Sequence, residues 1–140
     1  MGFKDQYNAV LNKIKEVVKT ITDVKLILVG EREKIEDTEF PCVFIIPRTD
    51  DIEYITGESR QHMCTFDLTT LIKNTDVQAG LVSCLDIALK IYDKIMEDKT
   101  LGYTCDTVFP RTIAPDYVVG PSEAYQWVTV RITTRIIELP

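Results

Sequence analysis

The chain has 140 residues, 45% of them hydrophobic and 27% charged, which is typical of one folded domain with its own core. Its formal net charge of −6 argues against a protein that binds DNA or RNA through a basic surface. Nine acidic and four basic side chains lie in residues 31–60, so this segment supplies −5 of that charge. We therefore expect a single domain over residues 1–140 with one acidic region.

The N-terminal sequence MGFKDQYNAV carries charge where a secretory signal needs an apolar run, and no apolar segment approaches the ~20 residues that cross a bilayer. Four cysteines are present, Cys42, Cys64, Cys84 and Cys105, and they have none of the spacings of a zinc clip. We expect them to be reduced and buried, in a protein that is made and kept in the cytoplasm without a membrane partner.

The first part of the chain predicts one helix followed by two strands. Residues 3–21 repeat apolar side chains every three or four positions, which indicates an amphipathic helix. Residues 23–29 predict a strand, and residues 40–47 predict a buried strand bounded by prolines. A charged connection, residues 31–39, lies between them. The sequence RTDDIEYITGES, residues 48–59, predicts a polar loop or the tip of a hairpin.

Residues 60–73 alternate with a period of two, which predicts a long strand whose even positions face the core. The single histidine, His62, lies on that even face with Cys64, Phe66 and Leu68. A histidine two residues from a cysteine also suggests a metal site or a nucleophile and its base. A metal site needs further ligands from elsewhere, and catalysis needs an accessible thiol and a group that orients the base. We therefore interpret His62 and Cys64 as structural residues.

Residues 74–100 predict the second helix. Thr75 and Gln78 fit a capping box at its start, and Gly102 lies where such a helix would end. The predicted buried stripe consists of Val77, Leu81, Cys84, Leu85, Ala88, Tyr92 and Ile95.

Two more strands, residues 103–109 and 124–139, are predicted by alternation. Between them, residues 110–123 contain three prolines and predict a loop, although this segment is rich in apolar side chains. The order of the elements predicts an α+β fold. We expect a mainly antiparallel or mixed sheet of about five strands, with both helices packed on one face.

The sequence contains no glycine-rich phosphate loop, no nucleophile elbow and no HExxH zinc motif. The adjacent acids Asp50 and Asp51 lie in a predicted polar loop, where solvated charge is the simplest interpretation. We therefore expect a protein that is not an enzyme and has no catalytic residues, no bound metal and no cofactor.

The second half of the chain follows a recognisable succession. A helix ending IYDKIMED runs into a turn that contains Asp98, Thr100, Leu101 and Gly102. A strand, a proline-containing loop with acidic and aromatic residues, and the closing strand WVTVRITTRIIE come next. This succession resembles the tail terminator family (tail completion, minor tail protein U-like) of long-tailed bacteriophages, as do the chain length and the helix-first order.

The resemblance implies a small α+β subunit that forms a ring, expected to be hexameric, at the head-proximal end of the tail in the virion. Such a ring caps the tail tube, ends its polymerisation and joins the tail to the head. The implied partners are other copies of the chain, the tail tube protein and the head–tail connector protein. DNA would pass through the ring without specific binding, and neither a cofactor nor catalysis is required.

A ring subunit must bury surface against its neighbours, so apolar and charged side chains of the predicted loops and the last strand are the candidate contacts. These are Asp50, Asp51, Glu53, Tyr54, Ile55, Tyr117, Val118, Val119, Arg131 and Arg135. One alternative is a cytoplasmic small-ligand or regulatory α+β module. Another is a different ring-forming neck or tail-tube protein.

Overall fold

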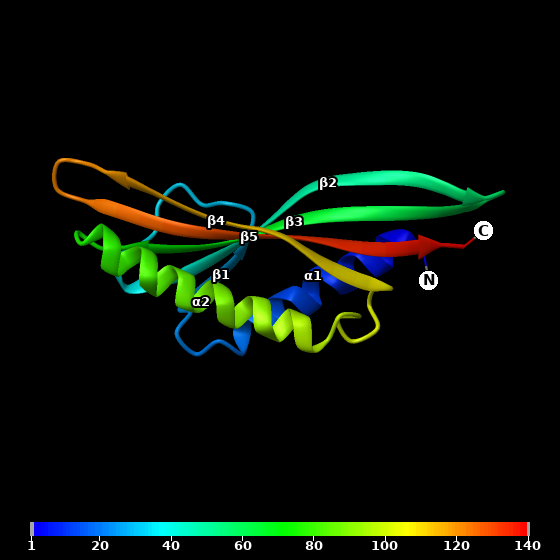
Figure 1. Ribbon diagram of the computed structural model, residues 1–140, viewed down its shortest axis with the longest axis horizontal. Coiled ribbons are helices and arrows are strands. Elements are labelled where there is room, and N and C mark those ends of the chain that lie inside the picture. Colours follow the sequence, from blue (N-terminus) through cyan, green and yellow to red (C-terminus); the bar gives the residue numbers. More distant parts are fainter. Residues whose placement is uncertain (1, 140) are drawn as a thin grey trace.

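A computed structural model describes residues 2–139 of the protein, with Thr56 described through its backbone alone. The elements in chain order are α1 (Phe3–Lys19), β1 (Leu26–Val29), the short 3-10 helix η1 (Asp37–Glu39), β2 (Cys42–Thr56), β3 (Ser59–Lys73), α2 (Val77–Glu97), β4 (Thr107–Val119) and β5 (Ala124–Glu138). The strands form a sheet in the order β1-β2-β3-β5-β4. Both helices cover the same face of this sheet (Figure 1), and the predicted α+β fold is confirmed.

The core lies between the two helices and the sheet. β1 runs parallel to β2, and the other neighbouring strands are antiparallel. Phe66 of β3 pairs with Ile132 of β5, and Leu68 pairs with Val130; all four side chains are buried. The even positions of both strands therefore point toward the helices, as their alternation predicts. We call the opposite side of the sheet, which no helix covers, the open face.

The start and the rotation of α2 differ from the prediction. Asp76, rather than Thr75, is the N-cap residue, and its carboxylate accepts a hydrogen bond from the backbone N–H of Ala79 at 3.1 Å. Leu85, predicted to be buried, is 39% exposed. The buried residues of α2 are Gly80, Cys84, Ile87, Ala88, Ile91 and Ile95. More than half of the circumference of this helix is apolar, so its sequence pattern alone does not fix which side meets the sheet.

Two predicted loops are instead strands. β2 continues to Thr56 through most of the predicted loop 48–59, which confirms only the hairpin-tip alternative. β4 begins at Thr107 and reaches Val119, so it occupies most of the predicted loop 110–123. The prolines within β4 are compatible with a strand because β4 is an edge strand, where a missing backbone N–H breaks no ladder on the outer side.

The turn after α2 is held by Asp98. Its carboxylate accepts hydrogen bonds from the backbone N–H of Gly102 at 2.8 Å and from the hydroxyl of Thr100 at 3.0 Å. Leu101 and Tyr103 both adopt left-handed backbone conformations, with φ of 48° and 63°. Such values are costly for residues other than glycine, so the turn keeps this shape through its hydrogen bonds and the fully buried side chain of Leu101. Over residues 2–139, no helix is long and apolar enough to cross a membrane.

A glycine in α2 makes room for a buried polar side chain. Gln126 of β5 is fully buried, and its Nε2 donates to the backbone carbonyl of Asn74 at 2.8 Å. A Cβ placed on Gly80 would lie 1.9 Å from Oε1 of Gln126. Helix propensity disfavours glycine here by about 1 kcal/mol, so close packing against Gln126 explains why glycine occupies the position.

We expect Gly80→Ala to lower the free energy of unfolding by about 1–3 kcal/mol, because the methyl group displaces Gln126 and breaks its bond to Asn74. Urea unfolding at equilibrium measures this loss. Ser83→Ala, on the exposed side of the same helix, is the matched control and should change stability little. In the double variant Gly80→Ala/Gln126→Ala the clash is absent, so its cost should be smaller than the sum of the two single costs. Additive costs would contradict the packing argument.

Candidate interaction surfaces

The end of the β2–β3 hairpin is the first candidate surface, and we call residues 50–59 the tip. It lies at one end of the elongated subunit, near both chain termini (Figure 1). Ile52, Tyr54 and Ile55 are exposed there, Tyr54 by 71%. The acids Asp51 and Glu53 alternate with them and are also exposed. The structure thus brings most of the candidate residues predicted in 50–55 into one exposed hairpin arm.

The tip has two chemically different sides. Ile52 pairs with His62 of β3, whose side chain lies under α1, so Ile52 points to the helix side of the sheet. Tyr54 is two positions further and points the same way. Asp51 and Glu53 alternate with them and point to the side of the open face. The exposed side chains of Ile52 and Tyr54 therefore lie on the helix side, where Asp50 contacts His62 at the base of the tip, and Asp51 and Glu53 lie on the open side.

His62 connects the base of the tip to the rest of the fold. Its Nδ1 lies 2.8 Å from a carboxylate oxygen of Asp50, and its Nε2 lies 2.7 Å from one of Glu138. The ring of Phe3 stacks on the imidazole with 3.6 Å between centroids. Arg60 binds the other oxygen of Glu138. The hydrogen bond from His62, followed by Arg60, holds the pKa of Glu138 below its usual range.

This arrangement bears on the two chemical hypotheses for His62 and Cys64. Both residues are buried on the helix side of β3, where the sequence places them. Each ring nitrogen of His62 faces a carboxylate, so neither is directed at the thiol or at open solvent. Burial, followed by the nearby charge of Asp50, raises the pKa of Cys64 to about 12. A buried thiol that stays protonated at neutral pH is a poor nucleophile and a poor metal ligand.

The other three cysteines are free and buried as well, which confirms the predicted state of all four. Within residues 2–139, no group of three or more His, Cys, Asp or Glu side chains is placed to hold a metal ion.

The second candidate surface combines α2 with β4. We call it the flank and define it as Val82, Leu85, Leu89, Ile113, Tyr117 and Val119, all of which are exposed. The three α2 residues are spaced at three and four and share one side of the helix. Ile113 pairs with Val130, and Tyr117 pairs with Gln126, so both point to the helix side of the sheet. The flank residues therefore lie on the helix side of the sheet edge, where α2 and β4 contact each other.

Only part of this surface is apparent in the sequence. Tyr117, Val118 and Val119 were predicted as contact residues, and the structure exposes all three at the end of β4. Val82 and Leu89 were not predicted, and Leu85 was assigned to the core. The signal that was available is the width of the apolar face of α2, which exceeds what one sheet surface can cover.

The outer edge of β4 is poorly suited to pairing with another strand. Pro115 lacks a backbone N–H and therefore occupies a non-hydrogen-bonded pair with Val128, with its nitrogen on the outer side. Tyr117 has the same orientation, and its N–H donates to the carboxylate of Asp116 at 2.8 Å. Two consecutive outward positions thus offer no free donor, a common protection against edge-to-edge association. Contacts through side chains are therefore favoured at this edge.

The open face carries a buried carboxylate held by two arginines. Asp67 accepts hydrogen bonds from Nε of Arg48 at 2.8 Å, and from Nε and Nη2 of Arg131 at 2.8 and 3.0 Å. The hydrogen bonds from Arg131, followed by those from Arg48, hold the pKa of Asp67 below its usual range. Arg131, predicted as a contact between subunits, therefore already has an acidic partner within the subunit. Arg135 lies half-buried on the same face, and its Nε makes no hydrogen bond to the described residues.

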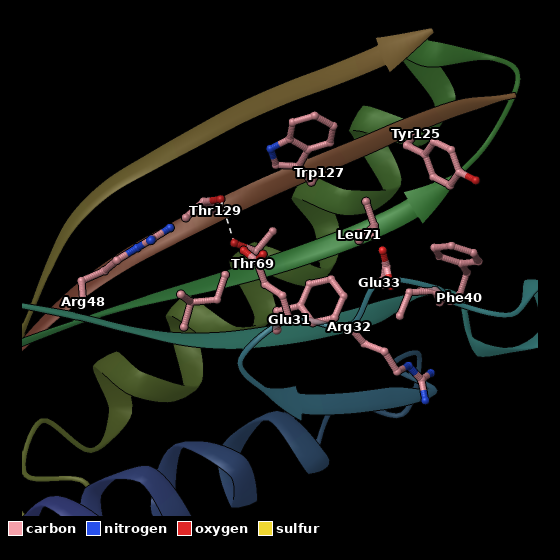
Figure 2. Close-up of a pocket in the computed structure, with 13 residues that line it drawn as sticks. Glu31, Arg32, Glu33, Phe40, Arg48, Thr69, Leu71, Tyr125, Trp127 and Thr129 are labelled. Atoms are coloured by element: carbon pink, nitrogen blue, oxygen red, sulfur yellow. Dashed lines mark hydrogen bonds between the residues drawn. The ribbon is translucent and has the colours of Figure 1, made fainter. Parts of the chain in front are cut away.

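A groove of about 460 Å³ crosses the open face beside the segment 31–40. Figure 2 shows Leu71, Tyr125 and Trp127 on the sheet side of the groove and Phe40 across from them. Glu31, Arg32 and Glu33 line it from the connecting segment. The sequence predicts the semi-polar character of this face but not the groove, because the groove depends on how the segment 31–40 folds over β2.

No protein-family model matches the chain, and no curated protein matches it significantly.

Asp67 predicts how stability depends on pH. Its pKa in the folded state lies below that in the unfolded state, so its contribution is complete above the unfolded value of about 3.9 and is lost as the pH falls through the folded value. Asp67→Asn should cost about 1–2 kcal/mol at pH 7, a modest value because water reaches both guanidinium groups. The difference in free energy of unfolding between this variant and the wild type should shrink below pH 4. Chemical unfolding at a series of pH values from 2 to 7 measures this difference. Asp93→Asn, at an exposed site on α2, is the control, and a difference that grows in acid would refute the assignment.

Tyr103 predicts a second measurable cost. The side chain is 93% exposed although its backbone is left-handed, so the protein tolerates strain to present an aromatic ring to solvent. Asparagine adopts this conformation more readily, so Tyr103→Asn should raise the free energy of unfolding by up to about 1 kcal/mol. Tyr117→Asn, in extended backbone, should give no such gain. Equal effects of the two substitutions in thermal unfolding would show that backbone strain is not the cause.

Proposed function

We propose that this chain is the structural subunit of a head-to-tail ring, of the kind formed by tail terminator proteins, which caps a phage tail tube. The observation that carries the proposal is the presence of two exposed apolar surfaces, the tip and the flank, on one subunit. A closed ring requires two different patches on each copy, because each copy contacts one neighbour through each patch. Two unlike surfaces on a single small domain fit that requirement.

The separation of these surfaces supports the same geometry. Arg60 pairs with Glu138 beside the tip, and Lys73 pairs with Tyr125 beside the end of β4. The thirteen residue steps from Arg60 to Lys73 span about 43 Å at ~3.3 Å per residue. Figure 1 places the tip and the β4–β5 hairpin at opposite ends of the subunit. Two contact surfaces at opposite ends of the subunit suit copies joined head to tail, and such a chain of contacts can close into a ring.

Apolar contacts carry most of the affinity in this proposal. Two of the charged candidates, Asp50 and Arg131, are already bound within the subunit, to His62 and Asp67. Exposed ion pairs contribute at most ~1 kcal/mol each, so raising the salt concentration should weaken assembly only modestly. The acidic side chains of residues 31–39 are mostly exposed, which suits a channel wall that repels DNA as it passes.

In this role the partners are other copies of the chain, the tail tube protein and the head–tail connector protein. The ring would end tube polymerisation and join the tail to the head at the head-proximal end of the tail in the virion. It would be assembled in the host cytoplasm. A hexamer is the stoichiometry that the family resemblance implies.

Replacing Tyr117 and Val118 with Asp tests the proposal. Buried carboxylates without partners are costly, so the double variant should remain a folded monomer where the wild type forms a ring. Sedimentation velocity measures the assembly state, and circular dichroism confirms the fold. Val29→Asp, an exposed apolar position on β1, is the matched control and should still assemble. A double variant that sediments as a ring would contradict the proposal, as would a wild type that stays monomeric at every concentration and with tail tubes.

The groove of about 460 Å³ on the open face favours one alternative, a small-ligand or regulatory module. Its volume lies within the range of small-molecule sites, and Trp127 and Tyr125 provide aromatic surface. Two results would support this module in place of the ring. The wild type would be monomeric, and a small aromatic ligand would raise the melting temperature of the wild type but not that of Trp127→Ala.

A further inference from the structure

Resting on the ring proposed above, we infer that the tip of one copy binds the flank of the next copy. The occupant of the flank is thus a second copy of this chain, and the contact involves its hairpin tip. A ring by itself does not determine which surfaces of neighbouring copies meet.

The apolar sides of the two surfaces match. Ile52 and Tyr54 point to the helix side of the sheet at the tip, and Ile113 and Tyr117 point to the helix side at the flank. In neighbouring copies whose sheets face the same way, the apolar side chains of tip and flank would lie on the same side of the junction, where they can pack beside one another. The flank is the longer surface, because it combines residues of α2 and β4, two elements that contact each other.

Charge is complementary on the opposite side. Asp51 and Glu53 of the tip point to the open side and form no ion pair with the described residues of their own subunit. At the flank, Arg111 lies in the bulge of β4, and its guanidinium lies 5.6 Å from the ring centroid of Phe109. Phe109 pairs with Thr133, which places this arginine beside the open face. The same relative orientation that joins the apolar sides therefore brings acid toward Arg111.

The blocked edge of β4 defines the kind of contact. Pro115 and Tyr117 offer no outward N–H to a neighbour, so the sheet of one copy cannot simply continue into the next. A tip that docks through its side chains avoids this restriction. The tip is also anchored for such a role, because His62 joins its base to Glu138 in β5 and to Phe3 in α1. A fixed projection loses less conformational entropy on binding than a mobile loop.

Disulfide trapping tests the pairing directly. Burial, the largest cause in each case, raises the pKa of Cys42 to about 11 and that of Cys64, Cys84 and Cys105 to about 12, so the native thiols are unreactive. A mixture of Tyr54→Cys and Val82→Cys proteins with oxidised glutathione should yield a disulfide-linked heterodimer on a non-reducing gel. Tyr54→Cys mixed with Val29→Cys is the matched control and should yield at least tenfold less. Equal yields in both mixtures would overturn the inference.

A second experiment uses two variants that each lack one surface. Tyr54→Asp removes the tip contact, and Val82→Asp/Leu85→Asp removes the flank contact; each should be a folded monomer by sedimentation velocity and circular dichroism. Their equimolar mixture should form a 1:1 dimer and nothing larger, because only one intact junction is possible between them.

The outcomes separate this inference from the ring itself. If Tyr54→Asp still assembles while the flank variant does not, the flank pairs with a surface other than the tip, and the inference is wrong. If both variants assemble like the wild type, a ring forms through other surfaces, and the inference is again wrong while the proposed function stands. If the wild type is monomeric under all conditions, with tail tubes included, both the ring and the pairing of tip with flank are wrong. In that case Tyr54→Cys and Val82→Cys should form no disulfide-linked heterodimer.

Discussion

The unbroken pairing of β3 with β5 is the constraint on which the rest of the structure depends. The register runs from Arg60 opposite Glu138 to Lys73 opposite Tyr125 without a bulge, and the even positions of both strands are buried under the helices. A slip of one residue would turn the buried row of one of the two strands to the open face, so the hydrophobic effect fixes this register strongly. Because β2 and β4 pair onto these two strands, the ladder also sets the distance between the tip and the end of β4.

Polar groups inside this framework join elements that are distant in the chain. His62 contacts carboxylates 12 and 76 residues away, and Asp67 binds an arginine 64 residues away. The buried carboxylate of Asp67 has two arginine partners, which limits the cost of removing it from water. The two clusters lie on opposite faces of β3, so one fixes α1 and the base of the tip while the other fixes the open face. Stability and the geometry of the candidate surfaces therefore share the same contacts.

The surface retains features that folding alone does not require. Exposed apolar side chains gather at the tip and along the flank, and Tyr103 is presented from a strained backbone. Isolated exposed apolar residues are ordinary, but contiguous ones indicate association with another surface. The outward edge of β4 lacks free donors at Pro115 and Tyr117, which limits uncontrolled strand pairing beside the same apolar surface. Together these features are consistent with an association through side chains at defined positions.

The sequence by itself determined what depends on local periodicity. The α+β class, the two amphipathic helices, the alternation of β3 and β5, and the burial of His62 and the cysteines follow from side-chain spacing, because neighbouring side chains of a helix or strand point in fixed directions. Tertiary structure decided the rotation of α2, which exposes Leu85, since a broad apolar face has no unique side until the sheet covers part of it. It also extended β2 to Thr56 and β4 to Val119, because β3 and β5 supply hydrogen-bonding partners that polar and proline-containing segments cannot supply for themselves.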